Sequence, residues 1–132
     1  MIFYLVNDFG LQRNWINAIS HWSSKLSYKK QSNLALEKGE VPVGCIFYHT
    51  ISKKIIAQSH NLTNLTSNAT THAEINCIEE IAFNLQFKRE IFSKKFNLTD
   101  DITIKNIFED CILFVICEPC IMCAYALSII SK

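Results

Sequence analysis

The stretch that decides the fold is CILFVICEPCIMC, residues 111–123. Its first part, Cys111–Ile116, is a continuous apolar run of strand length, which is typical of a strand buried on both faces of a sheet. Pro119 follows, and proline suits the first position of a helix, so we expect a last helix to begin there. A buried strand that leads directly into a helix predicts an α/β domain.

Upstream of this stretch, the spacing of apolar residues predicts a first helix within residues 12–37 and an amphipathic helix over His72–Phe87. The polar part of the first helix, Lys29–Asn33, is expected to break or fray. The residues that set its helical spacing are Trp15, Ile16, Ile19, Trp22 and Leu26.

Between these helices, Val41–Tyr48 is predicted to be a strand, with Ile55–Gln58 as its hairpin partner. Ser59–Thr70 is expected to be a polar loop, and Lys88–Asp110 a surface insertion or a short helix. The order α-β-β-α-β-α predicts a three-layer α/β/α domain with a mixed sheet.

Length and composition limit the class of protein. The 132 residues, 49% of them hydrophobic, suffice for one core. Three Gly and two Pro exclude a collagen-like or Pro/Gly-rich chain. No apolar run approaches the ~20 residues of a membrane span, and Ile2–Val6 lacks the basic residues of a signal peptide. We therefore expect a soluble, intracellular protein with no membrane partner.

Charge is spread unevenly along the chain. Residues 9–73 hold seven basic and two acidic residues, a balance of +5, whereas residues 74–118 hold five basic and nine acidic residues, a balance of −4. The basic half could meet a polyanion such as RNA. A solvated, lysine-rich face is an equally good interpretation of the same residues.

The six cysteines have two interpretations. An even number in a short chain is compatible with a disulfide framework, and four glycosylation sequons would agree with secretion: Asn61, Asn64, Asn68 and Asn97. However, Cys117, Cys120 and Cys123 lie three residues apart within one segment, whereas disulfide partners are usually dispersed. Reduced thiols that bind a metal are the better explanation.

Two segments carry the chemistry: His72-Ala73-Glu74 and Pro119-Cys120-Ile121-Met122-Cys123. Together they match the H-x-E…P-C-x-x-C signature of zinc deaminases. Cys120 and Cys123, at i and i+3 in the first turn of a helix, project to one side. His72 can be the third ligand, which leaves a fourth position for water, as in a catalytic zinc site. Glu74 would lie near that water and move its proton.

Each motif also has a simpler interpretation. Thr71-x-x-Glu74 fits a capping box, in which Glu74 only caps its helix. A single C-x-x-C is often redox-active or structural. Cys117-x-x-Cys120-x-x-Cys123 could begin an iron–sulfur run, but no fourth cysteine follows. The conjunction of the two motifs favours the zinc deaminase interpretation.

From about Lys25 to Lys132, the sequence resembles the tRNA adenosine deaminases, in particular the eukaryotic catalytic subunit that works with a non-catalytic paralogue. The stretches that carry this resemblance are Glu40–Cys45, Asn68–Glu74 and Glu118–Ala124. The paralogue lacks the glutamate that is present here as Glu74. The resemblance implies a cytidine-deaminase-like domain over residues 25–132, preceded by an N-terminal extension or helix over residues 1–24.

The resemblance also implies a reaction, which is the hydrolytic deamination of adenosine to inosine at the tRNA wobble position, with one catalytic zinc ion. Asn61 then matches the residue that holds the flipped adenine, and Val43 and Ala73 match positions beside the base. The implied partners are tRNA and either the paralogue, in a heterodimer, or a second copy, in a homodimer; the implied compartment is the cytoplasm, the nucleus or both. Two alternatives stay open: a cytidine or deoxycytidylate deaminase, and a zinc-stabilised interaction subunit without activity.

Members of the resembled family continue with further strands and a helix after the position of Lys132. On that basis the strand Cys111–Ile116 is expected to have an unpaired edge. We therefore expect the chain alone to be poorly soluble or to self-associate. Because its net charge is only +1, we also expect it to bind tRNA weakly.

Overall fold

One mixed sheet forms the centre of the molecule. A computed structural model describes residues 2–5, 21–99 and 102–131, with side chains for 27–99 and 102–131. Within these residues, four strands are ordered β1-β4-β2-β3. Strand β2 is antiparallel to β3 and β4, whereas β1 is parallel to β4. The strands are β1 (Ile2–Leu5), β2 (Gly44–His49), β3 (Lys54–His60) and β4 (Cys111–Val115).

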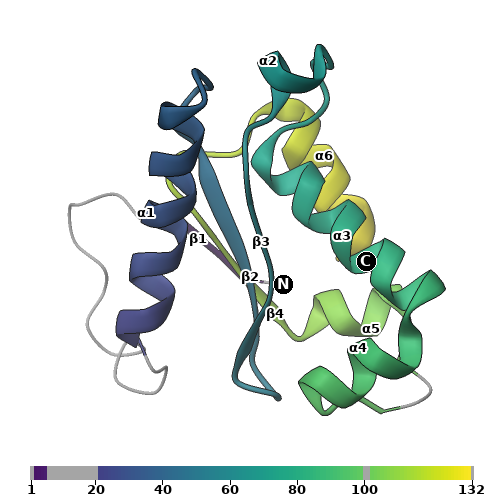
Figure 1. Cartoon of the computed structure of the whole chain (residues 1–132). Coiled ribbons are helices and arrows are strands. Elements are labelled where there is room, and N and C mark those ends of the chain that lie inside the picture. Colours follow the sequence, from purple (N-terminus) through teal and green to yellow (C-terminus); the bar gives the residue numbers. More distant parts are fainter. Residues whose placement is uncertain (1, 6–20, 100–101, 132) are drawn as a thin grey trace.

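Helices cover both faces of this sheet. Figure 1 shows α1 on one side and α3 and α6 on the other. Alternate residues of β2 follow this division, because Ile46 packs in a cluster with Tyr28 of α1, whereas Phe47 packs in the larger cluster on the opposite face. The predicted three-layer α/β/α fold is confirmed. The helices are α1 (His21–Glu37), α2 (Thr63–Thr66), α3 (Ala73–Phe87), α4 (Arg89–Phe96), α5 (Ile104–Glu109) and α6 (Ile121–Ile130).

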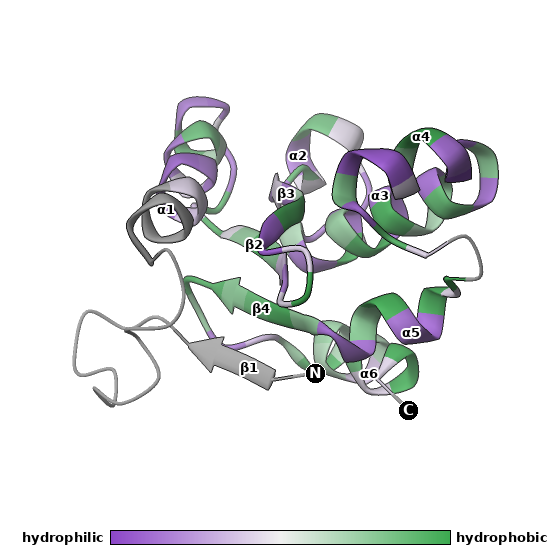
Figure 2. Ribbon diagram, turned by 90° about the horizontal axis from the view of Figure 1, so that it is seen from below, coloured by the Kyte–Doolittle hydropathy of each residue, from purple (hydrophilic) through white to green (hydrophobic). Residues whose placement is uncertain are grey.

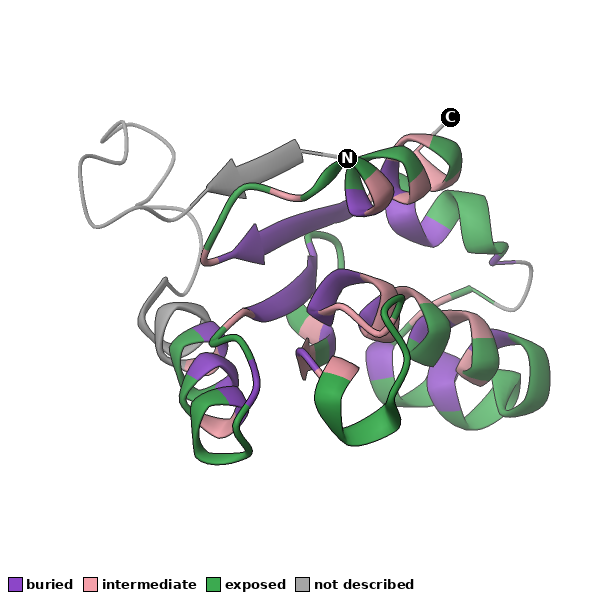
Figure 3. Cartoon of the chain, turned by 90° about the horizontal axis from the view of Figure 1, so that it is seen from above, coloured by how far each residue is buried: buried purple, intermediate pink, exposed green. Residues whose placement is uncertain are grey.

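Strand β4 is paired along both edges, so the predicted unpaired edge is wrong. Ile2–Leu5 pairs with Ile112–Val115 on one side, and β2 pairs with β4 on the other. Figure 3 shows β4 and β2 as buried strands, and Figure 2 shows that β4 is hydrophobic along its length. β1 was not predicted, because a short apolar run such as Ile2–Val6 has no feature that distinguishes a strand from part of a leader.

Helix α1 continues through Lys29–Asn33 to Glu37, contrary to the predicted break. The reason is burial, because Tyr28, Ser32 and Ala35 lie at helical spacing and are 1%, 8% and 0% exposed. Packing against the sheet thus stabilises a segment whose polar composition disfavours it. The predicted start of this helix, residues 12–20, lies outside the described residues.

Gly44 allows α1 to approach the sheet closely. A Cβ atom at this position would lie 2.3 Å from the carbonyl oxygen of Tyr28 and 2.5 Å from the backbone nitrogen of Ser32. Both neighbours are backbone atoms of a helix and cannot move aside without shifting it. A glycine at the start of β2 is therefore a packing requirement.

The segment Lys88–Asp110 was predicted to be a surface insertion or a short helix; it contains two short helices, α4 and α5, and is not a surface insertion. Phe92, Phe96 and Phe108 belong to the main core, and the ring of Phe108 packs edge-on against Phe47 of β2 at 5.4 Å between centroids. Because charged residues separate these aromatics in the sequence, the segment shows no apolar pattern from which its burial could be predicted.

Two predicted boundaries also differ from the structure. The predicted loop Ser59–Thr70 contains the end of β3 and the short helix α2. Helix α6 begins at Ile121 with Cys120 as its N-cap, so Pro119 lies just before the helix.

Among the described helices, none combines the length and apolar character needed to cross a bilayer.

Candidate metal centre and substrate loop

Two helix starts bring the predicted metal ligands together. His72 is the N-cap of α3 and Cys120 is the N-cap of α6, with Cys123 one turn further on. The Nδ1 atom of His72 lies 3.5 Å from the Sγ atoms of both cysteines. The three ligand atoms lie within 4.8 Å of one another. Among the described residues, no other group of three or more His, Cys, Asp or Glu side chains has ligand atoms this close together.

The three donors differ in exposure. Cys123 is buried, His72 is half-buried and Cys120 is exposed, so one side of the group faces solvent. Burial raises the pKa of the Cys123 thiol, and the nearby Glu74 carboxylate and Cys120 raise it further. A bound dication would reverse this effect, since it stabilises thiolates. One imidazole and two thiols suit zinc, and the open side suits a fourth ligand.

Glu74 lies in the first turn of α3 and is 3% exposed. The capping-box alternative is wrong, because the N-cap is His72 and Glu74 is therefore one position too early. The Thr71 hydroxyl instead donates to the Asn68 carbonyl oxygen at 2.8 Å. A buried carboxylate beside two thiols, without a capping role, is available to move a proton.

The three residues matched to substrate contacts form one hydrogen-bonded group. The backbone N–H of Asn61 donates to the Val43 carbonyl oxygen at 3.1 Å, and the Ala73 N–H donates to Asn61 Oδ1 at 3.1 Å. Asn61 is only 6% exposed, so it is unsuited to carry a glycan. The structure thus brings Val43, Asn61 and Ala73 next to His72, and their roles stay predictions.

Two interactions between distant residues were not predicted from the sequence. Cys45 of β2 and Cys77 of α3 are fully buried, with 3.4 Å between their Sγ atoms. Glu40 is a buried carboxylate that accepts bonds from the start of α2. No local pattern signals either pair, because the partners are more than 20 residues apart. Among the described residues all six thiols are free, and Cys117 stands outside the metal group.

A His/Cys/Cys group at two helix starts, on one face of a mixed sheet, defines the class of zinc deaminases. Residues 18–131 match the model of the family described as the cytidine and deoxycytidylate deaminase zinc-binding region. This chain therefore belongs to that family.

Relatives within the family include tRNA deaminases. The chain is 34% identical over 113 residues to tRNA-specific adenosine deaminase 2 of Xenopus tropicalis, covering 86% of this chain and 57% of the relative. It is 41% identical over 99 residues to the tRNA-specific adenosine deaminase of Rickettsia typhi, covering 75% of this chain and 55% of the relative. The chain thus spans a little over half the length of these relatives.

Solved structures agree with the fold. One, from a study of A-to-I editing by tRNA:A34 deaminases at the wobble position of transfer RNA, is 26% identical with a TM-score of 0.56, covering 80% of this chain and 65% of its own. Guanine deaminase from Bacillus subtilis is 21% identical with a TM-score of 0.58, and the match covers 86% of this chain and 60% of the guanine deaminase chain. The second likeness concerns the fold alone.

Proposed function

We propose that this chain is the catalytic part of a tRNA adenosine deaminase, which hydrolyses adenosine to inosine at the wobble position and releases ammonia. The observation that carries the proposal is the juxtaposition of His72, Cys120 and Cys123 with the buried Glu74. The names of the relatives from Xenopus and Rickettsia support adenosine in tRNA as the substrate.

In this proposal His72, Cys120 and Cys123 hold one catalytic zinc ion. When bound, zinc supplies Lewis-acid activation of the attacking water. Glu74 would take a proton from the attacking water and pass it to N1 of adenine, while the water oxygen adds to C6. Glu74 would then move the proton of the new C6 hydroxyl to the amine, which leaves as ammonia when the C6–N bond breaks. The burial of Glu74 supports this role, because bulk water cannot compete for the proton there.

Asn61, Val43 and Ala73 would form the base-binding side of the site. Because Asn61 Oδ1 already accepts from Ala73, its Nδ2 amide is the group that would donate to a ring nitrogen of the flipped base. Val43 is half-buried and would give apolar contact beside the base. We also propose that the deaminase domain begins near Lys25.

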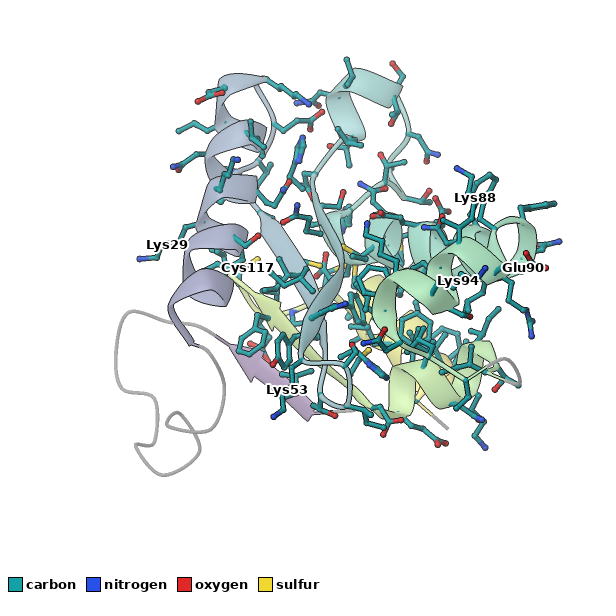
Figure 4. The ribbon with its side chains drawn as sticks, turned by 60° about the horizontal axis from the view of Figure 1, so that its bottom comes forward. Lys29, Lys53, Lys88, Glu90, Lys94 and Cys117 are labelled. Atoms are coloured by element: carbon teal, nitrogen blue, oxygen red, sulfur yellow. The ribbon has the colours of Figure 1, made fainter. Side chains whose placement is uncertain are left out.

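RNA binding by this chain would need help from a partner. Figure 4 shows Lys29 on α1, Lys53 at the β2–β3 turn, and Lys88 and Lys94 near α4, on three separate parts of the molecule. Scattered cations neutralise few contiguous phosphates, and phosphate neutralisation dominates RNA affinity. Ile121, Tyr125 and Ile129 are also exposed along α6. These features support a heterodimer with the non-catalytic paralogue, or a homodimer.

The test measures inosine in a tRNA anticodon stem-loop with adenosine at the wobble position, with and without the paralogue. We expect inosine from the complex, and a loss of about 10²- to 10⁴-fold in kcat for Glu74→Gln with zinc content unchanged. The matched control is Glu79→Gln, an exposed glutamate on the same helix. Uridine formed from cytidine would favour the cytidine deaminase alternative, and bound zinc without turnover would favour an interaction subunit.

A further inference from the structure

Helix α2 starts without a capping side chain of its own. Its N-cap is Leu62, which offers no hydrogen-bond acceptor beyond its backbone. The N–H groups of the first helical turn lack partners within the helix, so they must be satisfied from elsewhere. Here the acceptor comes from a residue more than 20 positions earlier in the chain.

That acceptor is the Glu40 carboxylate. Its Oε1 accepts the Leu65 N–H at 2.8 Å, and its Oε2 accepts the Asn64 N–H and the Thr63 hydroxyl, both at 3.1 Å. Glu40 is 4% exposed. A buried carboxylate is costly unless it is hydrogen-bonded, and these three donors compensate it. Burial by itself raises the pKa of Glu40, but the bonds from Leu65, Asn64 and Thr63 outweigh it and lower the pKa.

Glu40 is itself attached to the end of α1. Gly39 adopts a left-handed conformation with φ 71°, which lets the Glu40 N–H donate to the Ala35 carbonyl oxygen at 3.0 Å. The Asn64 side-chain amide donates to the Gly39 carbonyl oxygen at 2.8 Å, which adds a second link. In Figure 1, α2 lies at the same end of the molecule as the end of α1.

The loop that Glu40 holds carries the proposed site residues at its two ends. Asn61 precedes α2, and His72 follows the loop. The Leu62 N–H donates to the Thr71 carbonyl oxygen at 3.0 Å, which closes the loop between them. Movement of α2 would therefore be transmitted to Asn61, which directly precedes the N-cap of the helix.

We propose that Glu40 is a positioning residue, which holds the segment 61–71 so that Asn61 meets the substrate base beside the metal centre. This inference rests on the proposed deaminase function. Glu40 touches neither the base nor the metal and acts only through the loop. Its loss should raise KM for the RNA more than it lowers kcat, because Asn61 binds the base while Glu74 does the proton transfer.

The experiment uses the full chain, with the paralogue if the wild-type protein needs it, and the same stem-loop substrate. Glu40→Gln should lower kcat/KM about 10- to 100-fold, as expected for a displaced binding group, with zinc content unchanged. The matched control is Glu37→Gln, an exposed glutamate at the C-terminal end of α1, three residues before Glu40. In an Asn61→Ala background, Glu40→Gln should cost less than about 3-fold, since the two residues act through one contact.

Amide hydrogen exchange supplies a readout that does not depend on activity. Exchange at Asn64 and Leu65 should accelerate in Glu40→Gln and stay unchanged in Glu37→Gln. An active wild-type protein whose Glu40→Gln variant keeps full kcat/KM, or loses as much in the Asn61→Ala background, would overturn the inference. Should Glu40→Gln fail to fold, Thr63→Val removes one of the three bonds, and full activity in that variant would overturn it as well. A wild-type protein that makes no inosine while exchange responds as expected would overturn the proposed function and leave the anchoring intact.

Discussion

Helix α5 and helix α6 lie on either side of β4 in the sequence, and their first residues behave differently. The N-cap of α5 is Thr103, whose hydroxyl oxygen accepts the Asn106 N–H at 3.2 Å. The N-cap of α6 is Cys120, which makes no cap bond and instead lies 3.5 Å from His72. His72, the N-cap of α3, likewise makes no side-chain cap bond. The two helix starts that form the metal group therefore lack the side-chain cap of α5, as do those of α2 and α4.

This difference suggests a trade between stability and function. An N-cap side chain contributes about 1 kcal/mol to the stability of a helix, and the metal group forgoes two such caps. Zinc binding would more than compensate for the stability lost with these caps, because a metal that binds only the folded chain adds its binding free energy to the free energy of folding. Substitutions at these helix starts distinguish a role in metal binding from a role in the stability of the fold.

The largest effect is expected from removal of a ligand. Cys123→Ala should abolish stoichiometric zinc binding and inosine formation, since two remaining ligands do not hold a catalytic zinc ion. Metal content by mass spectrometry and the stem-loop assay check this result. Cys117→Ala is the control, because Cys117 lies in the same segment but outside the metal group. Full zinc occupancy in Cys123→Ala would contradict the assignment.

A second prediction concerns the cap of α6. Cys120→Ser places a good capping residue at an extended N-cap position, with φ −65° and ψ 168°. In the presence of a chelator, we expect the free energy of unfolding to rise by about 1 kcal/mol, while activity in zinc-containing buffer is lost. Urea denaturation of the metal-free proteins measures the difference, with Cys117→Ser as the matched variant. A destabilised Cys120→Ser protein would mean that the thiol contributes to the fold without metal.

The converse substitution is Thr103→Ala in α5. It removes the acceptor for Asn106 and should lower the free energy of unfolding by about 1 kcal/mol. Activity at a temperature well below the melting transition should not change, because α5 is not part of the metal group. Thermal denaturation and the stem-loop assay check the two halves of this prediction. A marked loss of kcat would show that α5 also supports the site.

The smallest effect is expected from the histidines outside the metal group. Burial lowers the pKa of His49, and the nearby Asp110 only partly offsets this; burial and Lys38 lower the pKa of His60. The unfolded chain therefore binds more protons just below the ordinary pKa of 6.5, so stability should fall as the pH drops below that value.

Urea denaturation at several pH values measures this slope. His49→Gln should make the dependence shallower, because it removes one of the groups that titrate in this range. The contribution of His60 should remain in that variant. An unchanged slope in His49→Gln would show that His49 is already protonated in the folded state or does not titrate in this range.

Local patterns predicted those parts of the molecule that depend on neighbouring residues. The run Cys111–Ile116 predicted β4, and the periodicity of His72–Phe87 predicted α3, because burial of a strand or helix face is written into residues two to four positions apart. The i, i+3 spacing of Cys120 and Cys123 placed both thiols on one side of a helix for the same reason. The signature of the motif then indicated zinc.

Only the tertiary structure decided the contacts between distant segments. The pairing of Ile2 with Ile112 leaves no local signal in either strand, and a short apolar run can be a strand or a processed leader. The burial of Phe92 and Phe108 depends on the sheet against which they pack. The hydrogen bond between Glu40 and the Leu65 N–H depends on the turn at Gly39 and on the close packing of α1 against Gly44. Such contacts are set by packing across layers, which no spacing within one segment records.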